Sequence, residues 1–265
     1  MKRFLAIILA GLMLISLVAC GGKKDDVVKF GVIEMPGMTD SMPAEHKQHM
    51  LNGEFVNYNN LSTALMDLES GKINQIFIET SVANYVAAHN EKITVLEDTN
   101  NVDFSMLTLD SNKEVYDILN NAIKEMKADG TLDALIENEL KAYINSDPVA
   151  KDLPRFDGAK TIKIGVTGDM PPMDFVAANG KAAGFNIALL TEIANRAQIN
   201  IELVHIESGS RPMALSSAKV DAVFWTKSAS CTACDAVGAE KVEGTIVTES
   251  YFTDTLAVIK LKSDK

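Results

Sequence analysis

Apolar residues recur along the chain in two patterns, short runs that predict strands and helical spacing that predicts helices, and the two patterns alternate. Short apolar runs bounded by turn residues predict strands near 28–33, 54–58, 74–79, 92–96, 103–109, 161–166, 201–205, 220–225 and 255–261. Helical spacing of apolar residues predicts helices near 40–51, 60–70, 80–89, 111–130, 131–143, 184–197 and 210–218. Residues 145–160 contain two prolines and show no period, which indicates a linker. The alternation favours a mixed α/β fold with mostly parallel strands.

The helix near 111–130 is the most clearly marked element. Ser111 can cap its N-terminus, and Gly130 is expected to end it. Between these residues the apolar side chains repeat at helical spacing, at Val115, Ile118, Leu119, Ala122, Ile123 and Met126. Such a stripe predicts one buried helix face.

Two pairs of segments resemble each other. The stretch "VVKFGVIEMP" (27–36) is similar to "TIKIGVTGDMPP" (161–172), and "LESGKINQIFI" (68–78) is similar to "LSSAKVDAVFW" (215–225). Two copies indicate two lobes of similar construction rather than a solenoid, which needs more repeats.

The first residues are typical of a secretory signal. Lys2 and Arg3 precede an apolar run that is too short to favour a membrane-spanning helix. The run ends in "LVAC" (17–20), which resembles the lipobox of bacterial lipoproteins. That resemblance implies a signal peptide over 1–19, lipid on Cys20 and a tether over 20–26; an ordinary signal peptide is the alternative.

The formal net charge of −11 argues against binding to nucleic acids or anionic membranes, which need basic surfaces. Cys231 and Cys234 form a C-x-x-C pair that can close as a disulfide, bind a metal with further ligands or stay reduced. We favour a disulfide within a loop. No second pair and no nearby His supplies metal ligands, so we expect no metal and no cofactor.

Several segments together resemble the bacterial extracellular solute-binding proteins of family 3, which bind amino acids and have the type II periplasmic binding protein fold. Residues 161–193 resemble the start of that family's first lobe, and "ALSSAKVDAVF" and "TESYFTDTLAVIK" resemble its continuation. The stretch "ALMDLESGKINQIFIETSVANYV" resembles the second lobe, and residues 103–140 resemble the return strand and closing helices.

The order of these segments differs from the family's order, because the second lobe and the closing helices come first here. The resemblance therefore implies a circularly permuted lobe order. The expected parts are a second-lobe-like unit (27–102), a hinge strand with closing helices (103–144), the linker (145–160) and a first-lobe-like unit (161–265). We expect the strands at 103–109 and 255–261 to lie near each other, with the closing helices on the unit at 161–255. An unpermuted two-lobed protein is the alternative.

In such a fold the ligand lies between the lobes, at the carboxyl ends of the strands. In the lobe at 161–265 the resemblance implies an aromatic platform near Met173 or Phe175, and a carboxylate-binding segment after the strand near 220–225. Candidate ligand-binding residues there are Asp169, Met173, Phe175, Trp225, Thr226, Lys227 and Ser228. The family's carboxylate-binding Arg is absent before Cys234. Lys227 or Arg211 could replace it, although Arg and Lys are not equivalent at such a site.

In the lobe at 27–102, Glu79 stands where the family tends to place an acid for the ligand's ammonium group. Its alternative role is to cap the next helix. Met38 and Thr39 lie in "PGMT", where the family has an anion-binding turn. We expect a small solute with a cationic or hydrogen-bond-donating group, with Glu79 as acceptor, Phe175 and Trp225 as walls, and Thr226 and Ser228 as donors.

The function implied by the resemblance is that of a monomeric, lipid-anchored extracytoplasmic receptor that passes a small polar solute to the permease of an ABC importer. The class of solute extends from amino acids to related amines and peptide-like compounds. The alternatives are an enzyme with the same fold, resembling cyclohexadienyl dehydratases, or a ligand sensor. Because no His falls in an expected cleft loop, we favour the receptor over the enzyme.

Overall fold

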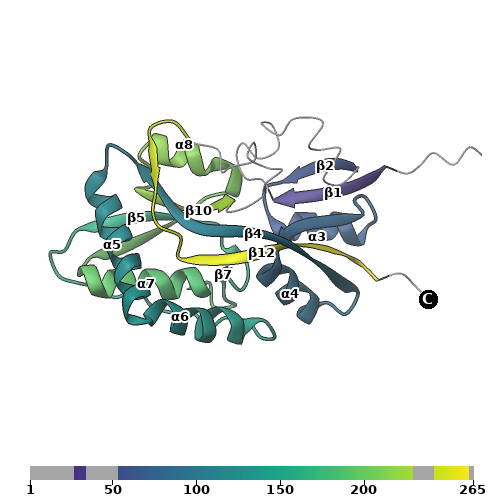
Figure 1. Ribbon diagram of the computed structural model, residues 1–265, viewed down its shortest axis with the longest axis horizontal. Helices are drawn as coiled ribbons and strands as arrows, with labels where there is room; N and C mark the ends of the chain where they lie inside the picture. The colour runs from purple at the N-terminus through teal and green to yellow at the C-terminus, as the bar shows by residue number, and fades with distance from the viewer. Residues whose placement is uncertain (1–26, 34–52, 229–241, 263–265) are drawn as a thin grey trace, which may run out of the picture.

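Two α/β lobes lie side by side and are joined by two long strands that cross between them (Figure 1). The computed structural model describes residues 27–33, 53–228 and 242–262. Within these ranges, none of the helices combines the length and the apolar character needed to cross a membrane.

The N-terminal lobe consists of elements that come before the first crossing strand. They are β1 (Val28–Ile33), β2 (Gly53–Tyr58), α3 (Leu61–Glu69), β3 (Gln75–Glu79) and α4 (Thr80–His89). The helix predicted near 40–51 lies outside the described residues.

The C-terminal lobe is built mostly from residues after the linker. Its elements are β5 (Thr161–Val166), β6 (Asp169–Met170), β7 (Asp174–Val176), β8 (Ala182–Ala183), α7 (Phe185–Ala197), β9 (Asn200–His205), a 3₁₀ turn (Ser208–Ser210), α8 (Arg211–Ser216), β10 (Ala222–Ser228) and β11 (Thr245–Val247). The strands β6, β7 and β8 form a small separate sheet.

The crossing strands are β4 (Ile93–Leu109) and β12 (Phe252–Leu261), which pair antiparallel at the centre of the molecule. Through them the described strands other than β6, β7 and β8 form one sheet in the order β2-β1-β3-β12-β4-β10-β5-β9, with β11 also paired to β4. On either side of the crossing strands the same arrangement repeats, because β1 is parallel to β2 and β3 while β5 is parallel to β9 and β10. The similar segments 27–36 and 161–172 therefore contain β1 and β5, and these two strands occupy equivalent positions in the two lobes.

The register of the crossing strands differs in part from the sequence prediction. The two strands predicted near 92–96 and 103–109 are one continuous strand, β4. Residues 255–261 pair with the first half of β4, as in Ile259 opposite Val95, while residues after Phe104 pair with β10 and β11. The strands that contain 103–109 and 255–261 do lie near each other, as predicted, because β4 pairs with β12 and Phe104 lies opposite Phe252. Their register differs, since residues 255–261 pair with residues 93–101 of β4.

The helix α5 (Lys113–Asp129) carries the predicted stripe, since Val115, Leu119, Ala122, Ile123 and Met126 are all buried. It ends at Gly130, which has the left-handed conformation with φ 80°. The prediction that Ser111 caps this helix is wrong, because Asn112 occupies the N-cap position. The Asn112 amide donates to the Leu109 carbonyl and closes a turn that contains Ser111, so the helix begins one residue later.

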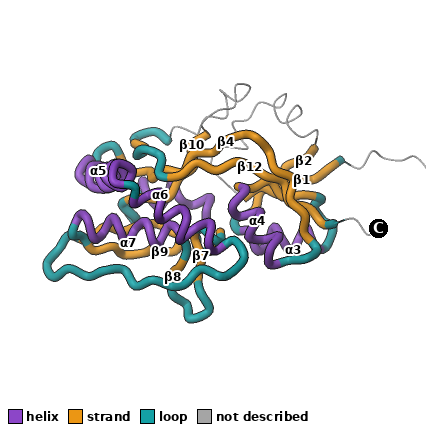
Figure 2. Tube along the Cα trace, turned by 60° about the horizontal axis from the view of Figure 1, so that its bottom comes forward, coloured by secondary structure: helices purple, strands orange, loops and turns teal. Residues whose placement is uncertain are grey.

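After Gly130 the chain continues as α6 (Thr131–Leu135), a π-helical turn (Ile136–Leu140) and a 3₁₀ turn (Lys141–Tyr143). The region predicted as one helix is thus helical throughout, with three hydrogen-bonding patterns. Figure 2 shows α5 and α6 beside α7 in the C-terminal lobe, with which both are in contact.

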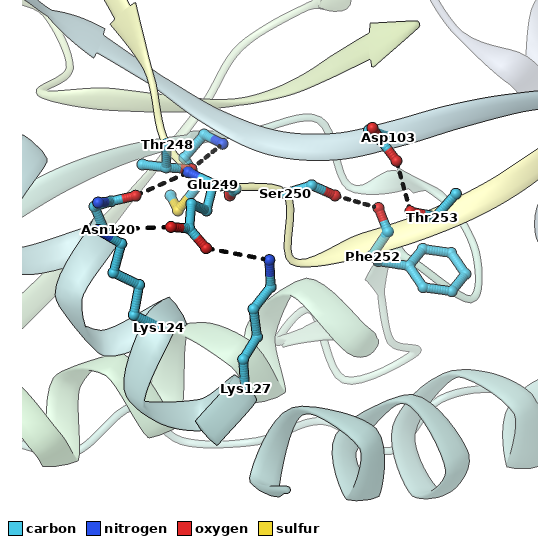
Figure 3. Close-up of polar contacts among 10 residues, drawn as sticks. Asp103, Asn120, Lys124, Lys127, Thr248, Glu249, Ser250, Phe252 and Thr253 are labelled. Carbon is cyan, nitrogen blue, oxygen red and sulfur yellow. Dashed lines mark hydrogen bonds and ion pairs between the residues drawn. The ribbon is translucent and has the colours of Figure 1, made fainter. Parts of the chain in front are cut away.

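Polar contacts fix the closing helices to the C-terminal lobe. Arg196 of α7 donates to Glu192 and to the Thr131 hydroxyl and pairs with Asp129 at 2.8 Å. Figure 3 shows a second set, in which buried Asn120 accepts from the Glu249 amide and the Glu249 carboxylate faces two lysines of α5. The helices that precede the linker therefore pack on the lobe that follows it.

The linker contacts both lobes, since the Tyr85 hydroxyl of α4 donates to Asp147 while later linker residues pair with the C-terminal lobe. Ala150 pairs with Ala183 of the small sheet, and the Phe156 amide donates to the Asn200 side chain at 2.9 Å. Apart from that single bridge, residues 145–160 contain no helix or strand, as the prolines predict.

Candidate functional site

A pocket of about 280 Å³ lies where loops of the two lobes meet. The loop after β2 supplies Asn59, Asn60 and Ser62 from the N-terminal lobe. The loops after β5 and β9 supply residues from the C-terminal lobe, namely Thr167, Asp169, His205, Ile206 and Glu207. These residues lie at or just beyond the carboxyl ends of β2, β5 and β9, the edge where open α/β sheets bind ligands.

Asp169 joins the two lobes at this pocket. Its carboxylate accepts a hydrogen bond from the Leu61 amide at 2.9 Å, at the start of α3, where the helix dipole favours negative charge. Burial raises the pKa of Asp169, and the hydrogen bond from Leu61 opposes that rise. A second cross-lobe bond runs from the Asn59 side-chain amide to the Glu207 carboxylate at 3.2 Å.

Glu79, at the end of β3, is buried, with 8% of its surface exposed. It occupies the N-cap position of α4, yet its side chain makes no capping hydrogen bond. Asp254 of β12 does this instead, because its carboxylate accepts from the Ser81 amide at 2.9 Å. Burial raises the pKa of Glu79; the nearby Asp254 raises it further, while Arg211 lowers it.

Arg211, the first residue of α8, is held in a fixed orientation. Its Nε donates to the Ser208 carbonyl at 2.9 Å and its Nη1 to the Phe224 carbonyl at 3.0 Å. The guanidinium also lies 5.6 Å from the centre of the Trp225 ring. Burial lowers the pKa of Arg211, and the charge of Glu79, followed by that of Asp174, raises it. Arg211 therefore lies within electrostatic reach of carboxylates from both lobes.

Asp174 is a site residue that the sequence reasoning missed. It lies in β7 and is buried, with one oxygen, Oδ2, accepting from the Thr167 amide at 2.8 Å. Its other oxygen, Oδ1, is buried without a hydrogen-bond partner among the described residues. Burial raises the pKa of Asp174, and the neighbouring charge of Asp169 adds to this. In the sequence, the one indication that Asp174 belongs to the site was its charge between the apolar residues Met173 and Phe175.

The remaining candidates of the C-terminal lobe lie in different surroundings. Met173 is buried in the main core, and Trp225 in a smaller core cluster with Leu107 and Leu215. Phe175 is half-buried and pairs with Asp169 across the small sheet. The backbone of Thr226, Lys227 and Ser228 continues β10 and pairs with β4. The candidates Met38, Thr39, Cys20, Cys231 and Cys234 lie outside the described residues.

His205 corrects the expectation that no His lies in a cleft loop, since it lines the pocket beside Asp169. The loops after β2 and β9 were not considered as sites. The rule that places ligands at the carboxyl ends of strands could have found both, because the two strands were predicted at 54–58 and 201–205.

Comparison with known sequences supports the resemblance for part of the chain. Residues 162–232, from β5 to just beyond β10, match the family of bacterial extracellular solute-binding proteins, family 3. No curated protein matches this chain.

Solved structures with similar folds come from several kinds of protein. A Brucella ovis ABC transporter periplasmic binding protein with glutathione bound aligns at 9% identity and TM-score 0.48, over 91% of this chain and 64% of its own. The GluR0 ligand-binding core with L-glutamate aligns at 14% and 0.43, over 90% and 86% of the two chains. CbnR, a LysR family transcriptional regulator, aligns at 9% and 0.46, over 100% and 76%.

The structure defines a class of fold. Two α/β lobes joined by two crossing strands, with a pocket where loops of the two lobes meet, form a two-lobed α/β fold. Within this fold, β5 to β10 carry the sequence pattern of the family 3 extracellular solute-binding proteins, which confirms the resemblance over residues 162–232.

Proposed function

We propose that this protein is an extracytoplasmic receptor that captures a small polar solute between its two lobes and delivers it to an ABC importer. The observation that carries the proposal is the pocket between the lobes, which residues of both lobes line and beside which hydrogen bonds run from Leu61 to Asp169 and from Asn59 to Glu207. A polar pocket between two lobes with a hinge suits a ligand that is enclosed when the lobes close.

The polar partners around Glu79 and Asp169 favour binding over a purely structural role. Asp254 caps α4, so the helix does not require Glu79. Burying a carboxylate costs stability, and active and binding sites are where buried ionisable groups concentrate. Glu79 therefore serves as the acceptor for the solute.

A thermal-shift screen of amino acids, amines and short peptides tests the receptor proposal, because a ligand that binds only the folded state raises the apparent melting temperature. We expect one class of solute to raise it in proportion to its concentration. The absence of any concentration-dependent shift, together with flat calorimetric titrations for the same compounds, would count against the receptor.

One observation favours the enzyme alternative. His205 and Asp169 line the same pocket, and such a pair could exchange a proton with a substrate. A turnover assay on cyclohexadienyl substrates separates the two functions. The receptor binds its solute and returns it unchanged, whereas the enzyme forms product at a rate that His205→Ala lowers.

Anchoring by lipid on Cys20 is the second part of the proposal. The support is the sequence "LVAC" before a short polar stretch that leads into β1. A tether of this kind would join the membrane to the N-terminal lobe.

We also propose that the lobe order is circularly permuted. The closing helices pack on the C-terminal lobe, and the described chain starts and ends on opposite sides of β3. Since β1 runs parallel to β3 and β12 antiparallel, Val28 and Leu261 lie at the same end of β3, about 10 Å apart at two strand spacings. A short loop could join them.

Relinking the chain tests the permutation. The variant joins Lys262 to Val27 by a short Gly/Ser loop and opens the exposed turn at Asp157 and Gly158, which restores the family's order. We expect it to unfold cooperatively near the temperature of the natural order and to bind the same solute. A relinked chain without cooperative unfolding would contradict the proposal.

A further inference from the structure

The start of α3 has no negative charge of its own. Asn60 caps the helix, since its side-chain oxygen accepts hydrogen bonds from the amide and the hydroxyl of Thr63. The first turn contains no acidic residue. The amide of Leu61, the first residue of the helix, has no partner within α3, because the first N–H groups of an α-helix point out of its end. The N-terminus of α3 therefore offers a free donor at the positive end of a helix dipole.

Asp169 supplies the missing carboxylate from the other lobe. Its Oδ2 accepts from the Leu61 amide at 2.9 Å, and α3 is in contact with β6, the strand that contains Asp169. Such a bond has a charged acceptor and is therefore stronger than a bond between neutral groups. The position of Asp169 is fixed by the small sheet, where it lies opposite Phe175 of β7. The carboxylate is thus held ready for the helix.

A second hydrogen bond joins the lobes at the same place. The Asn59 side-chain amide, just before α3, donates to the Glu207 carboxylate, just after β9, at 3.2 Å. Asn59, Asp169 and Glu207 all line the pocket. Both bonds run between protein atoms, so neither needs a solute in order to form.

Opening of the pocket requires these two bonds to break. The lobes are joined by β4 and β12, which remain paired across the centre of the molecule. Hinge motion in two-lobed proteins takes place at such connections and moves the lobes as rigid bodies. A motion that widens the pocket must move the C-terminal lobe's Asp169 and Glu207 away from Leu61 and Asn59. The bonds therefore favour the closed arrangement.

We propose that the bonds from Leu61 to Asp169 and from Asn59 to Glu207 form an interlobe latch that holds the lobes closed without a solute, with Asp169 as its principal residue. The inference rests on the proposed function of solute capture at this pocket. It gives Asp169 a role other than that of a ligand contact, because its Oδ2 already serves Leu61. A solute then meets a binding-competent form that is already populated, which strengthens its apparent affinity.

Hydrogen exchange at the Leu61 amide, measured by NMR on the full-length protein without solute, tests the latch. Among the described residues the acceptor of this amide is Asp169, so the closed lobes should protect it. We expect slow exchange in the natural protein. Asp169→Ala should raise the exchange rate at least about tenfold, as loss of a charge-assisted hydrogen bond predicts. Asp169→Asn keeps an acceptor without charge and should have a smaller effect.

Two controls and a second readout locate the effect. The Ala64 amide donates to the Asn60 carbonyl within α3, so its exchange should be the same in all variants. Asp157→Asn, a change at an exposed turn of the linker, should leave the exchange of Leu61 unchanged. In small-angle X-ray scattering, Asp169→Ala should have a larger radius of gyration than the natural protein, because its lobes open.

Fast exchange at Leu61 in the natural protein, or slow exchange that Asp169→Ala leaves unchanged, would overturn the latch. Faster exchange at Ala64 in both Asp169 variants would overturn it too, since Asp169 would then stabilise α3 rather than the contact between lobes. An unchanged radius of gyration in Asp169→Ala would show that other contacts hold the lobes together, which also contradicts the latch. The receptor proposal survives each of these results, because the solute screen tests it separately.

Discussion

Replacing Glu79 by glutamine separates a binding role from a structural role, because the two roles predict opposite effects on stability. Glu79 is buried, and Asp254 rather than Glu79 accepts from the amides of α4. Glutamine keeps the size of the side chain and removes its charge. We therefore expect the ligand-free variant to be at least as stable as the natural protein at neutral pH.

The pH dependence of this effect follows from the raised pKa of Glu79. For an acid with a raised pKa in the folded state, the free energy of unfolding is highest below the unfolded pKa, near pH 4.3, and falls as the pH rises through the folded value, because ionisation is disfavoured in the folded state. Glu79 is thus unfavourable at neutral pH and neutral to stability in acid. The stabilising effect of Glu79→Gln should be present near neutrality and should vanish below about pH 4.

The effect on binding has the opposite sign. A hydrogen bond to a charged group contributes about 1.5–3 kcal/mol, so its loss should weaken binding of the solute by about tenfold to a hundredfold. Melting curves across the pH range and calorimetric titrations measure the two effects, with Glu91→Gln as the exposed control. Unchanged affinity together with a lower melting temperature would refute the reasoning and assign Glu79 to the cap.

Three further perturbations address the rest of the molecule. Cys20→Ser should release the protein from membranes, since lipid contributes about 0.8 kcal/mol per buried methylene; continued sedimentation with membranes would contradict the anchor. Hydrogen bonds from Thr131 and then Arg196 lower the pKa of Asp129 to about 2, so Asp129→Asn should lower the melting temperature at neutral pH, and the difference should shrink as the pH falls towards that value. Ile123→Ala empties a fully buried position and should cost about 2–5 kcal/mol in urea unfolding; a cost below about 1 kcal/mol would show that α5 is not tightly packed.

Much of the fold was predictable because apolar period and turn residues act locally. The stripe from Val115 to Met126 gave α5, and Gly130 gave its end, since each depends only on neighbours along the chain. Continuity of β4 was not predictable. The polar residues near its centre broke the apolar pattern, and β12 pairs with the strand on both sides of that centre, at Glu97 and at Asn101, across a register shift.

The site was predictable in part, for a related physical reason. Glu79 and Asp169 follow strands, so their place at the carboxyl edge could be predicted from the order of elements. The roles of Asp174 and Asp254 depend on which distant amides they meet, those of Thr167 and Ser81, and tertiary structure alone decides this. Likewise, only the fold shows that the Ser208 and Phe224 carbonyls occupy Arg211.

Native mass spectrometry of the mature protein with its best-binding solute tests the capture of one small molecule between the lobes most directly. The account predicts one added solute mass per chain, retained in Glu91→Gln and lost or greatly reduced in Glu79→Gln at the same solute concentration. Equal occupancy in both variants would contradict a site between the lobes built on Glu79.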